Sequence, residues 1–364
     1  MSVLFDNFSY RLRITEEGIF HNRWYNDLYE EFNVAERCYY INNIINSILL
    51  HDLIYIRIDS LEEFIDIMGI ESTNKLLSCG ILKILDGWFE AVFFECGENS
   101  NMFMNLQKQT DEVQSKIIYR LRNQYQNSQC SLIKYILKNE LINFEEPSFI
   151  DNQAIINLDN DLENDRIREL LNITSSKSWE INNNDILQVT RLYLLNRNIE
   201  WSKFINTDEI FLESGAKIML LSKMGYNYKE TVLNGIDEIW TAKNIPNLAF
   251  LYKQKLITID EIIELREDVD GIKFREWIKS TDYDIIEIRK KLMEKIPNNL
   301  LTNFLRYSLI EGIGIFSEPF GIAASLMDFF LLQCKKWKPQ IYLDSTIPQY
   351  LKELEKRKYI KIFE

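Results

Sequence analysis

Glycine and proline are scarce in this chain, whose 364 residues include 12 glycines and 6 prolines. Long all-β architectures use more turn residues than that, so the scarcity favours helices. Disorder is also disfavoured, because hydrophobic residues make up 46% of the chain and aromatic residues 13%, as in a globular protein. A chain of this length has room for two or three domains.

Histidine is nearly absent, and cysteine is scattered. His21 and His51 are the only histidines, and neither has a second histidine or a cysteine at metal-ligand spacing. The five cysteines are odd in number and include no CxxC pair, which disfavours a disulfide framework or a zinc ribbon. Ser-His-Asp or Cys-His catalysis would need one of the two histidines as its base, and no GxSxG elbow accompanies them. We therefore expect no metal site, and thiols kept reduced in the cytoplasm.

Phosphate-binding loops of the GxxxxGK[ST] type do not occur in the sequence. Gly312-Ile-Gly314 begins like a dinucleotide loop, but Ser317 stands at the place of the third glycine and the flanks have a helical pattern. A tight turn between helices explains these glycines. No cofactor is therefore expected.

Long apolar runs are also lacking. No uncharged apolar stretch reaches the length of about 18 residues that a membrane-spanning helix needs. The first residues, MSVLFDNFSYRLRITEEG, do not contain the apolar core of a signal peptide. We therefore expect a cytoplasmic protein with no constitutive membrane span.

Basic residues are in the minority, and the net charge is −13. An acidic chain repels nucleic acid on average, so nucleic acid stays open as a partner but is not favoured. The charge is uneven, however, because eight bases face four acids from Lys335 to the last residue. An anionic partner, or a membrane surface, is therefore expected to contact Lys335, Lys336, Trp337, Lys338, Lys356, Arg357 and Lys358.

The first 105 residues combine strand and helix patterns. Apolar residues alternate over 53–58, and Ser60-Leu-Glu-Glu63 is a capping box that begins a helix. A second helix is expected over 71–78. Asp86-Gly87 then stands between two β-prone runs, which is a strong hairpin signal. Together these elements predict a small α+β module that resembles a winged helix.

Most of the remaining chain has the 3.6-residue periodicity of helices. After a linker over 98–106, helices are expected over 110–127 and 130–140. The acidic, asparagine-rich segment 143–165 has little periodicity and is expected to be a domain boundary. Short helices then follow to about residue 306, one of them beginning at the capping box Thr258-Ile-Asp-Glu261.

The last 55 residues or so contain three further elements. Residues 310–334 are apolar and rich in glycine, and they fit a buried helical hairpin. A short strand is expected over Ile341–Leu343, followed by a helix over Thr346–Arg357. The sequence thus predicts a mainly α fold in three parts: the α+β module (1–105), a helical connector with an acidic boundary (106–165), and a helical bundle or array (166–364).

Two kinds of acidic pattern in the sequence partly match known metal sites. The run from Asp159 to Asp165 begins like a calcium loop, but Asn164 and Leu170 stand where the glycine and the bidentate glutamate belong. Asp270-Gly-Ile-Lys273 and Glu353-Leu-Glu-Lys356 are the nearest matches to the carboxylate-x-Lys strands of nucleases, and neither lies on a convincing strand. A metal-dependent nuclease or other hydrolase that uses scattered carboxylates therefore stays an alternative function.

Two stretches resemble segments of an uncharacterised bacterial protein family. They are IPNLAFLYKQKLITIDEIIELREDVDGIKFREW (Ile245–Trp277) and GIGIFSEPFGIAASLMDFFL (Gly312–Leu331). The resemblance implies a bacterial, cytosolic origin and a place in an accessory system. It implies no activity, so no functional residue is carried over.

The leading hypothesis is a non-enzymatic interaction, sensor or regulatory protein of a bacterial accessory system, such as phage defence. Its grounds are the missing catalytic motifs and the helical array, which offers surface for a protein partner. Besides the hydrolase, a second alternative is a membrane-active effector that acts through residues 310–338, whose apolar part is followed by lysines suited to lipid headgroups.

Overall fold

The computed structural model describes residues 2–5, 12–15, 18–21, 34–86, 89–95, 101–107, 110–142, 147–212, 214–224, 232–281, 284–293, 337–358, 360 and 362. They belong to two compact units, residues 1–229 and residues 230–364. Helices predominate in both units, and a small sheet lies in the first. The prediction of a mainly α protein with an N-terminal module of mixed type and a C-terminal helix array is therefore confirmed.

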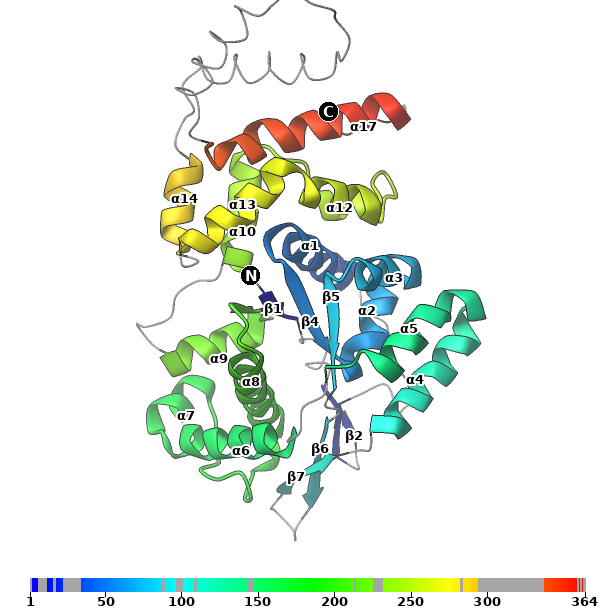
Figure 1. Cartoon of the computed structure of the whole chain (residues 1–364). Coiled ribbons are helices and arrows are strands. Elements are labelled where there is room, and N and C mark those ends of the chain that lie inside the picture. Colours follow the sequence, from blue (N-terminus) through cyan, green and yellow to red (C-terminus); the bar gives the residue numbers. More distant parts are fainter. Residues whose placement is uncertain are drawn as a thin grey trace, which may run out of the picture. The chain divides into compact units, whose positions relative to one another are not determined.

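A four-stranded parallel sheet organises the N-terminal unit (Figure 1). Its strands are β1 (Ser2–Leu4), β4 (Leu53–Arg57), β5 (Leu82–Leu85) and β8 (Glu209–Ile210). Their order in the sheet is β5-β4-β1-β8. Val3 is paired with Ile54 on one side and with Glu209 on the other, so β1 lies inside the sheet although it is only three residues long.

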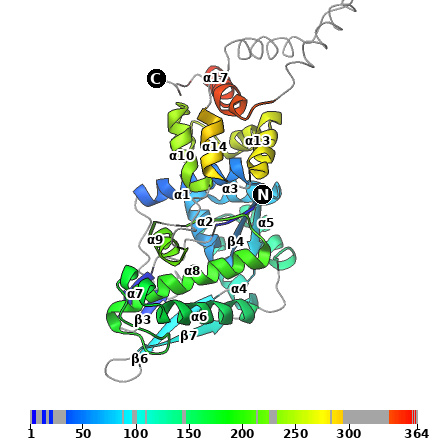
Figure 2. The ribbon, with the colours of Figure 1, turned by 90° about the vertical axis from the view of Figure 1, so that its left-hand side faces the viewer.

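Helices account for most of the other described residues of this unit. They are α1 (Val34–Leu50), α2 (Leu61–Met68), α3 (Ile70–Ser78), α4 (Thr110–Gln124), α5 (Asn127–Asn139), α6 (Pro147–Glu163), α7 (Asp165–Leu171), α8 (Ile186–Ile205) and α9 (Ser214–Met224). α1 packs against β4 and α3 packs against β5, on one side of the sheet (Figures 1 and 2). On the other side, Leu4 and Leu85 form a buried cluster with Ile150 of α6 and Trp201 of α8. The sheet is thus covered by helices on both faces.

The hairpin expected at Asp86-Gly87 is wrong. β5 is paired in parallel with β4, and the antiparallel hairpin is made one strand later, by β6 (Phe89–Glu95) and β7 (Asn101–Gln107). The linker expected over 98–106 is therefore largely strand. A strand of a parallel sheet and a strand of a hairpin can show the same apolar run, so the local pattern does not distinguish them. A second hairpin joins β2 (Leu12–Thr15) to β3 (Gly18–His21).

The acidic segment 143–165 contains a helix, α6, where a domain boundary was expected. Ile150, Ala154, Leu158 and Leu162 recur every four residues and are buried. This spacing places them on one face of the helix. Three of them join the core that α6 shares with α8, so the segment lies within the unit that runs to residue 229.

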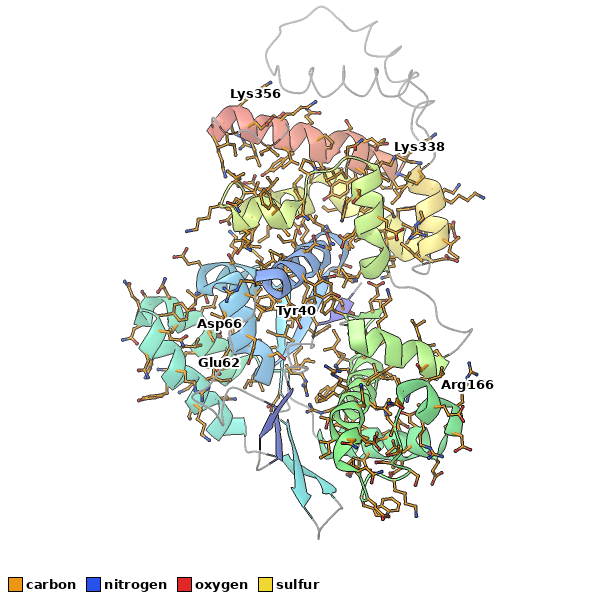
Figure 3. The ribbon with its side chains drawn as sticks, turned by 180° about the vertical axis from the view of Figure 1, so that it is seen from behind. Tyr40, Glu62, Asp66, Arg166, Lys338 and Lys356 are labelled. Atoms are coloured by element: carbon orange, nitrogen blue, oxygen red, sulfur yellow. The ribbon has the colours of Figure 1, made fainter. Side chains whose placement is uncertain are left out.

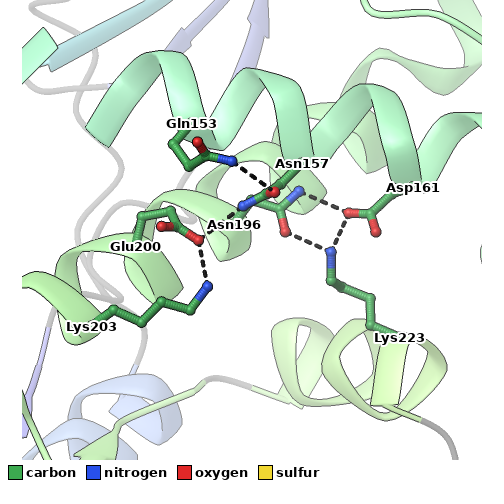
Figure 4. Close-up of polar contacts among 7 residues, drawn as sticks. All are labelled: Gln153, Asn157, Asp161, Asn196, Glu200, Lys203 and Lys223. Carbon is green, nitrogen blue, oxygen red and sulfur yellow. Dashed lines mark hydrogen bonds and ion pairs between the residues drawn. The ribbon is translucent and has the colours of Figure 1, made fainter. Parts of the chain in front are cut away.

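α8 is enclosed by other elements, since residues 192–198 are all buried. A buried polar side chain requires a hydrogen-bonding partner, and Asn196 has two (Figure 4). Its Nδ2 donates to Asp161 Oδ2 of α6 at 2.8 Å, and its Oδ1 accepts from Lys223 Nζ of α9 at 2.7 Å. Lys223 also forms an ion pair with Asp161. This network joins three helices.

A second polar group continues along the same two helices (Figure 4). Asn157 Nδ2 of α6 donates to Glu200 Oε1 of α8 at 2.9 Å, and Lys203 Nζ donates to the same oxygen at 2.7 Å. Gln153 Nε2 donates to Asn157 at 3.3 Å. Because the polar side chains of α6 follow one another at intervals of four residues, they line one edge of the contact with α8.

Asp185 anchors the loop that leads into α8. Its Oδ2 accepts hydrogen bonds from the backbone nitrogen and hydroxyl of Thr174, at 2.8 and 2.7 Å, and from those of Ser175, both at 2.6 Å. Burial raises the pKa of this carboxyl, but the four hydrogen bonds favour its charged form and lower the pKa overall.

The C-terminal unit is an array of helices. They are α10 (Val232–Ala242), α11 (Leu248–Lys253), α12 (Ile259–Glu267), α13 (Val269–Ser280), α14 (Ile285–Met293), the π-helix η5 (Tyr342–Thr346) and α17 (Ile347–Lys358). The capping box at Thr258 is confirmed, since its hydroxyl accepts from Glu261 N and its backbone nitrogen donates to Glu261 Oε2. The strand expected over 341–343 is wrong, because these residues form a helical turn that continues into α17.

Tyr342 fixes η5 to the helices beneath it. The side chain is fully buried, its ring lies 5.0 Å from that of Phe274, and its hydroxyl donates to the Leu265 carbonyl at 3.1 Å. Burial raises the pKa of this phenol, so the hydroxyl stays a hydrogen-bond donor.

Replacing Tyr342 with phenylalanine should lower the free energy of unfolding by about 1 kcal/mol, because the ring stays packed while one buried hydrogen bond is lost. Urea denaturation measures the change. Tyr350→Phe is the matched control, since its hydroxyl binds Glu264 at an exposed position and its loss should cost less. If Tyr342→Phe lowered the free energy of unfolding no more than Tyr350→Phe does, the hydrogen bond from Tyr342 to Leu265 would not be what holds η5.

Candidate functional site

The order of the strands points to one edge of the sheet. The chain passes from β1 to β4 and β5 in one direction, and it returns through α8 to β8 on the other side of β1. In doubly wound sheets, ligands bind outside the carboxyl ends of the strands where the order reverses. The residues directly after β1 and β8 therefore mark the first candidate site, which we call the switch point.

Aromatic side chains occupy the switch point. Phe5 follows β1 and Phe211 follows β8; their rings stack with centroids 4.1 Å apart and an interplanar angle of 3°. Tyr40 of α1 meets Phe211 edge-on at 6.1 Å. Phe5 and Phe211 are buried, and their backbone nitrogens donate to Tyr55 O and Leu4 O. The carboxyl ends of β1 and β8 are thus filled by the chain's own rings.

Charged side chains lie at the carboxyl end of the next strand. Arg57, the last residue of β4, is fully buried, and Glu62 and Glu63 are buried in the first turn of α2. Arg120 Nη1 of α4 lies 3.4 Å from Glu62 Oε2. Figure 3 shows Glu62 on α2 together with Asp66, whose carbonyl accepts from Arg37. The positive end of the helix dipole also stabilises acids in this turn.

Ser60-Leu-Glu-Glu63 correctly predicted the start of α2, but its side chains do not form a capping box. Ser60 has a helical backbone conformation in the 3₁₀ turn η2 (Ile58–Ser60), so its hydroxyl makes no cap hydrogen bond. The two glutamates are therefore buried acids in the first turn of α2. Four charged residues stand within seven positions at the end of this apolar strand, and their density could have indicated this group from sequence: Arg57, Asp59, Glu62 and Glu63.

The two histidines lie in different parts of the N-terminal unit. His21 ends β3, and its side chain is outside the described part of the chain. His51 is fully buried, and its Nε2 lies 2.7 Å from Glu209 Oε2, the first residue of β8. This pair lies at the amino edge of the sheet, opposite to the switch point. It joins the α1–β4 connection to β8.

The seven residues expected to contact an anionic partner do not form one group. Lys335 and Lys336 are outside the described residues. Lys338 and Lys356 lie at opposite ends of the C-terminal helical segment (Figure 3). Trp337, beside Lys338, donates its indole nitrogen to Asp270 Oδ1 at 3.0 Å.

The basic residues at the end of α17 face in different directions. Lys358 Nζ is bound to Glu261 Oε2 at 2.6 Å and to the Leu256 carbonyl at 3.1 Å. Lys356 and Arg357 are exposed, and the Arg357 guanidinium lies 5.7 Å from the Tyr350 ring centroid. Lys356 and Arg357 are therefore the two predicted residues best placed to meet a partner.

The acidic patterns make contacts within the chain. Asp159 accepts a hydrogen bond from Ser178 N at 2.9 Å, and Asp161 pairs with Lys223. Asp270 accepts from Trp337 and from Thr346 Oγ1, at 3.0 and 2.8 Å. Among the described residues, no three histidine, cysteine or acidic side chains lie together as metal ligands. Within the same part of the chain, no helix has the length and apolar character needed to cross a bilayer.

Three comparisons with known proteins found no similar protein. No protein-family model matches the chain, and searches of curated proteins and of solved structures also found no match.

Proposed function

We propose that the chain is a non-enzymatic interaction protein of the bacterial cytoplasm that regulates an accessory system, and that it binds an acidic protein partner through the exposed end of α17. We call this surface, made of Lys356 and Arg357, the α17 basic end. The resemblance in the sequence implies the accessory system, and phage defence is one example of such a system.

The observation that carries the proposal is the way α17 is held. Tyr350 donates to Glu264 at 2.5 Å, and Lys358 binds Glu261 at 2.6 Å, so two contacts hold this helix to α12. Leu351 and Leu354 are buried on the same helix, while Lys356 and Arg357 remain exposed. A basic pair on a helix that is already fixed loses little conformational freedom when a partner binds.

The switch point supports the non-enzymatic part of the proposal. A parallel sheet of this order offers its carboxyl edge as a ligand site. Here, stacked Phe5 and Phe211 fill the position between β1 and β8. The ends of β1 and β8 therefore complete the core of the N-terminal unit and do not line a ligand site.

Affinity capture with the double variant Lys356→Glu/Arg357→Glu tests the proposal. The tagged full chain should retain a protein from extracts of its host, and the variant should retain it at least about tenfold less, because two attractions become repulsions. Quantitative mass spectrometry of the captured proteins gives the ratio.

Lys279→Glu/Lys290→Glu makes the same charge change at exposed positions of the same unit and should leave the capture unchanged. Equal capture by both double variants would refute the α17 basic end. Vesicles of anionic lipid serve as a second probe, and co-sedimentation that depends on Lys356 and Arg357 would favour a membrane over an acidic protein and so count against the proposal.

A further inference from the structure

The hairpin of α4 and α5 has an unusual charge for this chain. Residues 113–139 hold five of the 42 basic residues and none of the 55 acids. The bases are Lys116, Arg120, Arg122, Lys134 and Lys138. The acids nearest to this stretch are Asp111 and Glu112 in the first turn of α4 and Glu140 directly after α5. A polyanion is the class of partner that such a surface attracts.

One face of each helix is fixed in the core. Ile117 and Leu121 of α4 are buried, as are Ile133 and Leu137 of α5. The two helices pack against each other, and α5 also packs on α3, where Asn74 Nδ2 donates to the Gln129 carbonyl at 2.7 Å (Figure 1). The opposite face of each helix is therefore presented by a rigid support.

The two helices repeat one motif, Ile-x-Tyr-x-Leu-(Arg/Lys)-Asn. It runs as IIYRLRN from Ile117 to Asn123 and as IKYILKN from Ile133 to Asn139. Packing explains why the isoleucines and leucines recur, since all four are buried. Packing does not explain why the residue types at the exposed positions recur, because these side chains are not part of the buried core.

The exposed positions carry an aromatic ring and a base. Tyr119 is 68% exposed and Tyr135 is 55% exposed. Arg122 and Lys138 follow them by three residues and are also exposed. Residues three apart are neighbours on a helix surface, about 5–6 Å between Cβ atoms. Each helix therefore places a phenol ring beside a cation in the same geometry.

We infer that the α4–α5 hairpin binds single-stranded nucleic acid. An exposed ring stacks on an unpaired base, while a cation one helical turn away neutralises the neighbouring phosphate. Two such pairs on adjacent helices would hold two stretches of one strand. A duplex would leave the rings unused, because its bases are already stacked on one another. This surface is independent of the α17 basic end.

The other three basic residues of the hairpin are assigned no role in binding. Lys116 has no counterpart in α5, where Leu132 stands at the matching place. Arg120 lies 3.4 Å from Glu62, and it is only partly exposed. Lys134 is also partly exposed and has no counterpart in α4, where Ile118 stands at the matching place. The amide of Asn139 donates to the Tyr135 carbonyl at 2.9 Å, so the asparagine supports the helix. The rings and the cations at Arg122 and Lys138 carry the inference.

Fluorescence anisotropy with the full chain tests whether the α4–α5 hairpin binds single-stranded nucleic acid. The probe is an oligothymidylate of about 16 nucleotides, compared with oligouridylate, with a duplex of the same length and with polyglutamate. The wild type should bind both single strands more tightly than the duplex or polyglutamate. Tyr119→Ala/Tyr135→Ala should weaken binding about tenfold or more, whereas Tyr119→Phe/Tyr135→Phe should retain it.

The salt dependence of the affinity tests the role of Arg122 and Lys138. Arg122→Gln/Lys138→Gln should weaken binding and lower the slope of log affinity against log salt by about two, since two phosphate contacts are removed. Lys279→Gln/Lys290→Gln removes the same charge at exposed positions outside the hairpin and should change neither the affinity nor the salt slope. The inference is overturned if the wild type does not bind the single strands, if it binds duplex or polyglutamate equally well, or if the tyrosine variant binds like the wild type. Circular dichroism confirms that these surface variants are folded.

Discussion

Replacing Asp185 with alanine is expected to lower the free energy of unfolding of the N-terminal unit by about 3–5 kcal/mol. One oxygen of this carboxylate accepts four hydrogen bonds from Thr174 and Ser175. Alanine would leave their donors without the charged acceptor that orders the loop before α8. Urea denaturation of the full chain, followed on the transition of the N-terminal unit, measures the loss.

Asp165→Ala is the matched control. The Asp165 side chain is 82% exposed and forms an ion pair with Arg168 on the same helix. Such surface pairs contribute little, so the change should stay below about 0.5 kcal/mol. Similar losses for the two variants would mean that the hydrogen bonds of Asp185 do not hold the loop.

The contribution of Asp185 should also depend on pH. Its pKa is lower in the folded chain than the value of about 3.9 that an aspartate has when unfolded. The stabilisation is therefore fully present above about pH 4, and it is lost as the pH falls through the folded pKa. The difference in stability between the wild type and Asp185→Ala should accordingly narrow in acid. A constant difference between neutral pH and the acid limit would contradict this.

Replacing Phe211 with alanine should cost about 3–5 kcal/mol, because the ring is buried and its loss opens a cavity against Phe5. Phe211→Leu keeps most of the volume and should cost less than half as much. The same urea transition measures both.

Phe204→Ala controls for the loss of a ring, since that side chain is 51% exposed near the end of α8. It should cost about 1 kcal/mol or less. If Phe211→Ala cost no more than Phe204→Ala, the switch point would not be part of the core. The position between β1 and β8 would then be open to a ligand, against the proposed function.

Local signals explain which elements could be predicted from the sequence. The helix α12 was correctly placed because the capping box at Thr258 and its apolar spacing agree. The end of α2 was likewise marked by Gly69, whose φ of 82° suits glycine. Such signals act over a few residues, so one sequence suffices to find them.

The parallel sheet could not be predicted in the same way. β1 has three residues and β8 has two, which is too short for a periodic pattern. Their pairing joins Val3 to Glu209 across most of the N-terminal unit, and no local feature encodes such a contact. The switch point follows from this pairing, so it could not be predicted from the sequence either.

The charged surfaces of the chain could be predicted from the sequence less well than its helices. The C-terminal bases are close in sequence, but the helix turns Lys358 toward Glu261 and leaves Lys356 exposed. The repeat that includes Tyr119 and Tyr135 is present in the sequence, but the net charge of −13 is a sum over the whole chain and does not indicate a local basic face. Local charge on one face decides what a surface attracts, and net charge does not.

Hydrogen exchange of the full chain, alone and with its captured protein partner, tests the proposed function most directly. We predict slower exchange of backbone amides in α17 near Lys356 and Arg357, with no new protection at Phe5 or Phe211. Protection at the ends of β1 and β8, with α17 unchanged, would contradict the account by placing the partner at the switch point.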